Sequence, residues 1–161
     1  MLDALGARPR LQNLTVHPPE PGEVRVRMRA AGLCHTDVSQ VRDARFTPIL
    51  LGHEGAGEVE SVGEGVEGLE PGDPVPGLLE GAVRNLPEAV VGLERTRTFR
   101  GDGPIGAMLN AGCFCNYIVL PAAGAIPIRA DLPLEQAALV GCAVVTGVGA
   151  ALWTAAIGRR G

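Results

Sequence analysis

The chain has 161 residues, a length typical of one domain of roughly 100–200 residues that buries its own core without disulfide or metal staples. Hydrophobic residues make up 46% and aromatic residues only 3%, so the predicted core is aliphatic, and 23 glycines with 13 prolines favour short strands and many turns over a helical bundle. The net charge of -4 arises from interspersed acidic and basic residues, which weighs against nucleic acid or an anionic membrane as the main partner.

The N-terminal stretch lacks the apolar segment of a signal peptide, and no run approaches about 18 apolar residues. We therefore expect a cytoplasmic protein with reduced thiols and no membrane contact. The spacing of its four cysteines, at positions 34, 113, 115 and 142, is unlike that of a secreted disulfide framework.

The first half of the chain predicts strands joined by turns. Between residues 24 and 30, apolar residues alternate with three arginines, which is the period-two pattern of a half-buried strand. Further strands are predicted over residues 56–62 and 114–120. Cys113 and Cys115 are one residue apart, so on a strand they would point the same way; we expect them to pack as small residues, with a redox role as the alternative. Residues 76–110 have weak periodicity and predict a long surface lobe.

The C-terminal part predicts helices. Pro133 suits the first position of a helix, and residues 134–140 are rich in helix formers. We expect a break at Gly141 and a second apolar helix over residues 144–157. Trp153 is expected to be a buried core residue of that helix. The alternative is that its helix faces another domain or a neighbouring chain.

Residues 101–106 match the pattern G-x-G-x-x-G of a dinucleotide-binding loop. No apolar strand precedes the match, Pro104 lies inside it, and no acidic residue follows about 20 positions later. The match therefore predicts an ordinary loop.

The candidate chemistry lies in two short stretches, Gly-Leu-Cys-His-Thr-Asp at 32–37 and Gly-His-Glu-Gly-Ala-Gly at 52–57. Cys34 and His53 are residue types that bind zinc, and nearby carboxylates can orient the imidazole. Cys142 is the candidate third ligand, since a catalytic zinc needs only three from the protein. The alternative is that both cysteines are buried small hydrophobes and His53 caps a turn.

These stretches resemble the zinc-site signature of the zinc-dependent alcohol dehydrogenases, in the medium-chain dehydrogenase/reductase superfamily. The signature reads Gly52-His53-Glu54-x-x-Gly57-x5-Gly63-x-x-Val66 in this chain. Agreement in order extends to Pro-Gly-Glu-Val at 21–24, Ala-Gly-Leu-Cys-His-Thr-Asp at 31–37, Pro-Gly-Asp-Pro-Val at 71–75 and Gly-Cys-Ala-Val-Val-Thr-Gly at 141–147.

The resemblance implies a mostly β (α+β), GroES-like, partly open β-barrel with a few helices, formed by residues 1–161, with no nucleotide-binding Rossmann domain. Within it, residues 76–110 correspond to a degenerate structural-zinc lobe, and residues 131–157 to a helical tail leading toward a nucleotide-binding domain. That lobe contains no cysteine, so only one zinc is expected.

Carried over position by position, the resemblance implies specific roles. The catalytic zinc ligands would be Cys34, His53 and Cys142, and we expect their donor atoms to lie within about 4 Å of one another. The catalytic residues would be Thr36, which takes the alcohol proton, Glu54 beside the metal, and Asp37, which orients His53. The cofactor contacts would be His35, near phosphate, and Thr146, near the nicotinamide.

The resemblance thus implies an oxidoreductase that converts a small alcohol to an aldehyde or ketone with NAD, present as its catalytic domain. With two cofactor contacts only, this chain alone is not expected to turn over alcohol with NAD. The alternative is an inactive zinc-binding remnant or interaction module of the same family. A zinc-free reductase is disfavoured because the ligand trio is present. An exposed apolar C-terminal boundary is expected to favour a homo-oligomer or a partner chain.

Overall fold

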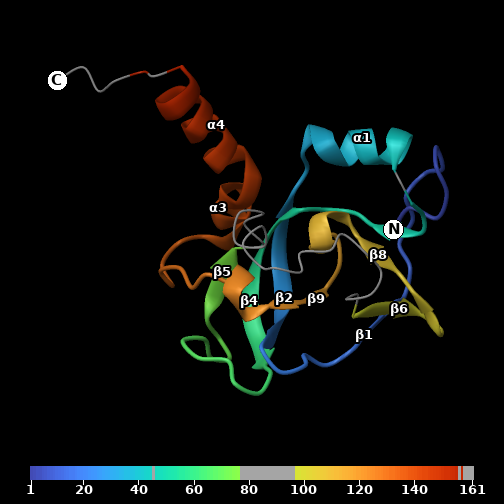
Figure 1. The fold of residues 1–161 in the computed structure, drawn as a ribbon, viewed down its shortest axis with the longest axis horizontal. Helices are drawn as coiled ribbons and strands as arrows, with labels where there is room; N and C mark the ends of the chain where they lie inside the picture. Colours follow the sequence, from blue (N-terminus) through green and yellow to red (C-terminus); the bar gives the residue numbers. More distant parts are fainter. Residues whose placement is uncertain (45, 77–96, 156, 158–161) are drawn as a thin grey trace.

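The centre of the fold is a four-stranded antiparallel sheet in the order β5-β4-β2-β9 (Figure 1). The structure, a computed structural model, describes residues 1–161 apart from 45, 77–96, 156 and 158–161. The strands of this sheet are β2 (Glu23–Gly32), β4 (Glu54–Val62), β5 (Pro74–Pro76) and β9 (Tyr117–Pro121). The described part of the chain is mostly sheet, as the resemblance implies.

Two small sheets flank the central one. The first pairs β1 (Thr15–Val16), β6 (Thr98–Arg100) and β7 (Gly103–Pro104), and the second pairs β3 (Ile49–Leu50) with β8 (Gly106–Ala107) in parallel. Short 3-10 turns cover Met108–Asn110 and Ala122–Gly124. The predicted lobe at 76–110 therefore contains three short strands in its later part, while its residues 77–96 lie outside the described residues.

The residues matching G-x-G-x-x-G run from the turn of the β6–β7 hairpin through β7 to the first residue of β8, with Gly101 at a φ of 60° in the turn. Among the described residues, the single parallel pairing is β3 with β8, over two residues each, and neither strand belongs to a strand-helix-strand crossover of a dinucleotide-binding domain. The expectation of an ordinary loop at this position is consistent with the hairpin.

Strand β2 confirms the alternation predicted from its sequence. Val24 and Val26 are buried, while Arg27 and Arg29 on the opposite face are exposed. Val24 lies opposite Val62 on one side and Leu120 on the other, so aliphatic pairs join the three strands. The main core is aliphatic and comprises Val24, Val26, Val59, Val75, Ala111, Cys113, Ile118, Leu120 and Ala125.

The neighbouring cysteines pack as expected but lie before β9 rather than on a strand. Cys113 is buried in the main core, and its amide donates to the carbonyl of Gly52 at 3.0 Å. The half-buried Cys115 thiol donates to the carbonyls of Gly112 and Tyr117. The strand predicted over residues 114–120 is present as β9, but it begins only at Tyr117, some residues after a turn at Gly112, whose φ is 59°.

Burial of Cys113 predicts a loss of stability at alkaline pH. Desolvation raises the pKa of its thiol from 9.0 to about 12. Above pH 9 the unfolded chain therefore releases this proton while the folded chain retains it, so the free energy of unfolding falls as pH rises. The loss reaches about 4 kcal/mol at pH 12.

Urea unfolding from pH 8 upward should show that the free energy of unfolding falls less steeply with pH in Cys113→Ala than in the wild type. The matched truncation Val75→Ala, in the same core, should lower stability without changing this pH dependence. If Cys113→Ala kept the pH dependence of the wild type, the buried Cys113 thiol would not be its cause.

The C-terminal helix differs from the prediction of two helices with a break at Gly141. The helical stretch is continuous and comprises α3 (Leu134–Leu139), a π-helical turn (Val140–Val144), α4 (Val145–Gly149) and a second π-helical turn (Ala150–Thr154). Glycine lowers helix propensity by only about 1 kcal/mol and does not forbid the helical conformation. A wider turn at Gly141 therefore takes the place of the predicted break.

One face of this helix packs on the sheet, and the remainder is exposed. Ala137 and Ala138 are buried against Ala56 of β4, whereas the helix beyond them extends away from the sheet (Figure 1). Trp153 is 77% exposed, so its predicted place in the core is wrong. The expected exposed apolar boundary is confirmed by Leu139, Val144, Val145, Val148, Leu152, Trp153 and Ile157.

The stretch Leu134–Thr154 is also long and apolar enough to cross a membrane, judged by length and composition. This stretch was not expected from the sequence, because polar residues such as Gln136 and Thr146 interrupt its apolar run. A single helix of this kind is weak evidence for a membrane span, because core and interface helices of soluble proteins have the same composition.

Candidate metal centre

Cys34 lies at the junction between the long strand β2 and the helix α1 (His35–Asp43). Its φ of -104° and ψ of 161° are extended, as is usual for the residue that precedes a helix. The amide of Cys34 donates to Asp37 Oδ2 at 2.9 Å, and its thiol donates to Thr36 Oγ1 at 3.7 Å. The first turn of α1 therefore fixes the position of Cys34.

His53 and Glu54 lie where the loop after β3 enters β4, and both are buried. The preceding Gly52 has a φ of 94°, and a Cβ there would lie 2.6 Å from the Phe114 ring and 2.7 Å from the Phe114 amide nitrogen. Only glycine allows this close approach, which delivers His53 to the end of β2.

Asp37 joins the two loops that carry Cys34 and His53. Its carboxylate is 2% exposed; Oδ2 accepts from the Cys34 amide, and Oδ1 accepts from the Gly52 amide at 3.1 Å. Oδ1 also lies 3.4 Å from His53 Nδ1. That nitrogen is buried and, among the described residues, has no partner with full hydrogen-bond geometry. A metal at Nε2 would hold the proton on Nδ1, facing the carboxylate.

Cys142 reaches the site from the C-terminal helix, in the π-helical turn Val140–Val144. Desolvation raises the pKa of its thiol to about 12, and a hydrogen bond with Glu54 and the nearby Cys34 thiol act in the same direction. The thiol therefore carries its proton at neutral pH, and a metal ion binding there must displace it. A π-helical turn is a frequent feature of functional sites.

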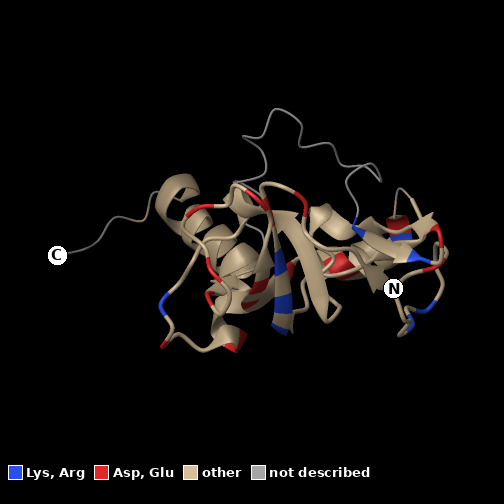
Figure 2. Ribbon diagram, turned by 90° about the horizontal axis from the view of Figure 1, so that it is seen from below, with Lys and Arg blue, Asp and Glu red and all other residues tan. Residues whose placement is uncertain are grey.

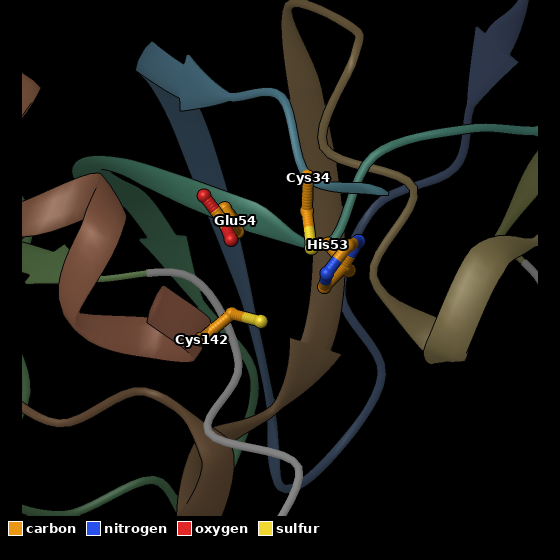
Figure 3. A group of neighbouring side chains, drawn as sticks. All are labelled: Cys34, His53, Glu54 and Cys142. Atoms are coloured by element: carbon orange, nitrogen blue, oxygen red, sulfur yellow. The ribbon is translucent and has the colours of Figure 1, made fainter. Parts of the chain in front are cut away.

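The four side chains Cys34, His53, Glu54 and Cys142 converge, although they come from three separate parts of the chain (Figure 3). One donor atom from each lies within 4.8 Å of all the others. Zinc bound at about 2.3 Å to sulfur and about 2.1 Å to nitrogen places such donors slightly closer, near the expected 4 Å. Two thiols, an imidazole and a carboxylate are ligands typical of zinc, and the buried His53 Nδ1 faces Asp37, which leaves Nε2 as the nitrogen that could bind the ion.

Glu54 has room beside the thiols because Gly32 has no side chain. A Cβ at Gly32 would lie 2.3 Å from Glu54 Oε2 and 3.0 Å from a methyl of Leu139. Gly32 and Gly52 are the first residues of the two stretches at 32–37 and 52–57, and Gly52 opens the zinc-site signature, but the sequence alone did not indicate the close packing that requires them.

The remaining predicted site residues lie at the edge of this cluster. Thr36 and His35 are exposed in the first turn of α1, and Thr36 is the closer to the cluster through Cys34. Thr146 is exposed on α4, four residues after Cys142. His35 and Thr146 thus face solvent, where a bound cofactor has access to them.

The chain is similar to known proteins in both sequence and structure. Residues 20–130 match the family described as "Alcohol dehydrogenase GroES-like domain". The alcohol dehydrogenase class-3 of Cereibacter sphaeroides is 34% identical over 169 aligned residues, covering 91% of this chain and 45% of that protein. The S-(hydroxymethyl)glutathione dehydrogenase of Paracoccus denitrificans is 32% identical over 169 aligned residues, which again cover 91% of this chain and 45% of that protein.

Solved structures of the same kind superpose on the chain. An alcohol dehydrogenase zinc-binding domain protein from Burkholderia ambifaria has a TM-score of 0.83 at 29% identity, covering 96% of this chain and 48% of that one. The benzyl alcohol dehydrogenase of Acinetobacter calcoaceticus has a TM-score of 0.72 at 27% identity, covering 94% and 46%. The chain thus spans less than half the length of each of these proteins.

Proposed function

Because the chain belongs to the zinc-dependent, medium-chain alcohol dehydrogenase family through its GroES-like domain, we propose that it forms the zinc-binding catalytic part of an NAD-linked alcohol dehydrogenase. The substrate class is a small alcohol or the matching aldehyde or ketone. The observation that carries the proposal is the convergence of Cys34, His53 and Cys142 within one 4.8 Å group.

In this proposal Cys34, His53 and Cys142 hold one zinc ion. Bound there, zinc supplies a Lewis acid that makes an alcohol hydroxyl more acidic. Asp37 acts on His53, since its carboxylate faces Nδ1 and fixes the ring so that Nε2 points away from it. Glu54 lies beside the ligands, where its carboxylate could approach the metal when no alcohol is bound and move aside when an alcohol binds.

The proton and the cofactor are assigned to exposed residues of the same region. Thr36 accepts the alcohol proton and passes it to water, which its exposed position in α1 permits. NAD, when bound, would supply the hydride acceptor, and His35 would contact its phosphate while Thr146 would contact its nicotinamide. These residues alone do not fix a dinucleotide, so further protein surface completes the cofactor site.

The wider assignments follow from family membership. Residues 1–161 form one GroES-like catalytic domain, with the degenerate lobe at 76–110 and the helical tail at 131–157. The protein is cytoplasmic, like a soluble dehydrogenase. The exposed apolar helix face is covered by a second copy of the chain or by a partner chain.

A second candidate function is a zinc-binding module without dehydrogenase activity. It is favoured by the place of Glu54 inside the donor group, because two thiolates, an imidazole and a carboxylate complete a tetrahedral, closed site. The two functions differ in whether an exogenous ligand reaches the metal.

Cobalt substitution distinguishes these two functions. In the catalytic proposal, adding trifluoroethanol to the Co(II)-loaded chain shifts the visible d–d absorption bands in a saturable way, because one coordination position is open. Thr36→Val, which replaces a hydroxyl with a methyl group, is expected to weaken the alcohol response while leaving cobalt affinity unchanged. Bands that do not respond to alcohol would contradict the catalytic proposal and support the closed module.

A further inference from the structure

A pocket of about 410 Å³ lies apart from the metal group. It is bounded by the N-terminal segment, strand β2 and the turn leading into β9, and none of the four metal-group residues lines it. Its volume is in the range of pockets that bind small organic molecules. Neither the zinc site nor the proposed dehydrogenase chemistry makes use of it.

The wall of this pocket combines apolar and cationic side chains. Leu14, Val16, Leu50 and Phe114 supply apolar surface. Among the described residues that line it, the charged side chains are Arg10, Arg27 and Arg29, and none is an aspartate or a glutamate. A concave surface of this kind matches a ligand with an apolar body and an anionic head.

The ion pairing of β2 leaves Arg27 available. Arg25 pairs with Glu60 at 2.9 Å, and Arg29 pairs with Glu58 at 2.8 Å. Glu58 is the residue directly opposite Arg27 in the sheet, yet its carboxylate is bound to Arg29. Among the described residues, neither Arg27 nor Arg10 has a carboxylate within ion-pair distance. Figure 2 shows the β2 arginines as blue bands along the strand.

We propose that this pocket binds an aliphatic monocarboxylate of about six to ten carbons, a length that suits its volume. Arg27 binds the carboxylate through its guanidinium, whose paired N–H groups match the two carboxylate oxygens. Arg10 adds a second positive charge from the opposite segment, and the alkyl chain lies against Leu14, Val16 and Phe114. A larger polyanion is disfavoured because the apolar wall leaves most of its charge without partners.

Titration of the full 161-residue, zinc-loaded chain with octanoate, followed by amide NMR shifts, tests the proposal. We expect saturable shifts confined to residues 10–16, 27–29 and 114–117. Arg27→Gln should weaken binding about tenfold, as expected for losing a charged hydrogen-bonding partner, and Arg27→Lys should weaken it less. Arg27 is exposed, so neither variant should disturb folding. The matched control Arg129→Gln, at another exposed arginine, should bind octanoate like the wild type.

Three results would overturn the proposal. The first is octanoate affinity in Arg27→Gln within twofold of the wild type. The second is shifts centred on Cys34, His53 and Cys142, which would place the carboxylate on the metal. The third is shifts along the exposed helix face around Trp153, which would indicate adsorption of the alkyl chain to apolar surface. In this pocket, octanol, which has the same chain without the charge, is expected to bind more weakly than octanoate.

Discussion

Cys142→Ala is expected to weaken zinc binding by about a thousandfold, since zinc-binding free energies of about 10–16 kcal/mol are shared among a few ligands. Cys142 is the most informative ligand to remove, because it is the member of the metal group that lies on the C-terminal helix. Competition with a chromophoric zinc chelator measures the change.

The matched control for this substitution is Cys113→Ala. Cys113 is the same residue type, but it is buried in the main core and lies outside the metal group. It should retain wild-type zinc affinity while losing some stability. Zinc affinity in Cys142→Ala within a fewfold of the wild type, with the fold intact by circular dichroism, would remove Cys142 from the site.

Asp37→Ala is expected to lower the free energy of unfolding by about 3–5 kcal/mol, because it leaves buried polar groups without partners. The Cys34 and Gly52 amides both lose their acceptor, and the buried His53 ring loses the carboxylate that it faces. Zinc affinity should fall by about 10–100-fold, the usual effect of removing such an orienting partner. Urea unfolding and chelator competition measure the two effects separately.

Asp43→Ala provides the control on the same helix. Asp43 is exposed at the end of α1, where its loss should change stability by less than about 0.5 kcal/mol. Asp37→Asn keeps one acceptor oxygen and should fall between the wild type and Asp37→Ala. If Asp37→Ala proved as stable as Asp43→Ala, the carboxylate would not hold the two loops together.

The sheet could be predicted from sequence because its signal is local. In β2 the alternation of valines with arginines records which face is buried, and the structure confirms it at Val24 and Val26. The cysteines before β9 show the limit of that signal. The strand predicted over residues 114–120 begins only at Tyr117, after a turn at Gly112 with positive φ, and an apolar pattern alone does not report backbone dihedral angles.

The helical tail was harder to predict because its conformation depends on distant contacts. Gly141 signals a break by propensity, yet packing of Ala137 and Ala138 on β4 holds the helix in place and a π-helical turn continues it. The exposure of Trp153 follows from where the sheet ends, which its local sequence does not encode. Residue types alone suggested Cys34, His53 and Cys142 as ligands but left buried small cysteines as an alternative, because Cys34 and Cys142 are separated by more than a hundred residues and their spacing says little; the resemblance favoured the ligand set.

The most direct test of the proposed zinc centre is X-ray absorption at the zinc edge of the loaded chain. The proposal predicts one zinc per chain with two sulfur ligands at about 2.3 Å and the remaining ligands nitrogen or oxygen at about 2.0–2.1 Å. One sulfur should disappear in Cys142→Ala, and none should disappear in Cys113→Ala. Three or four sulfurs in the wild type, or two sulfurs that persist in Cys142→Ala, would contradict the centre formed by Cys34, His53 and Cys142.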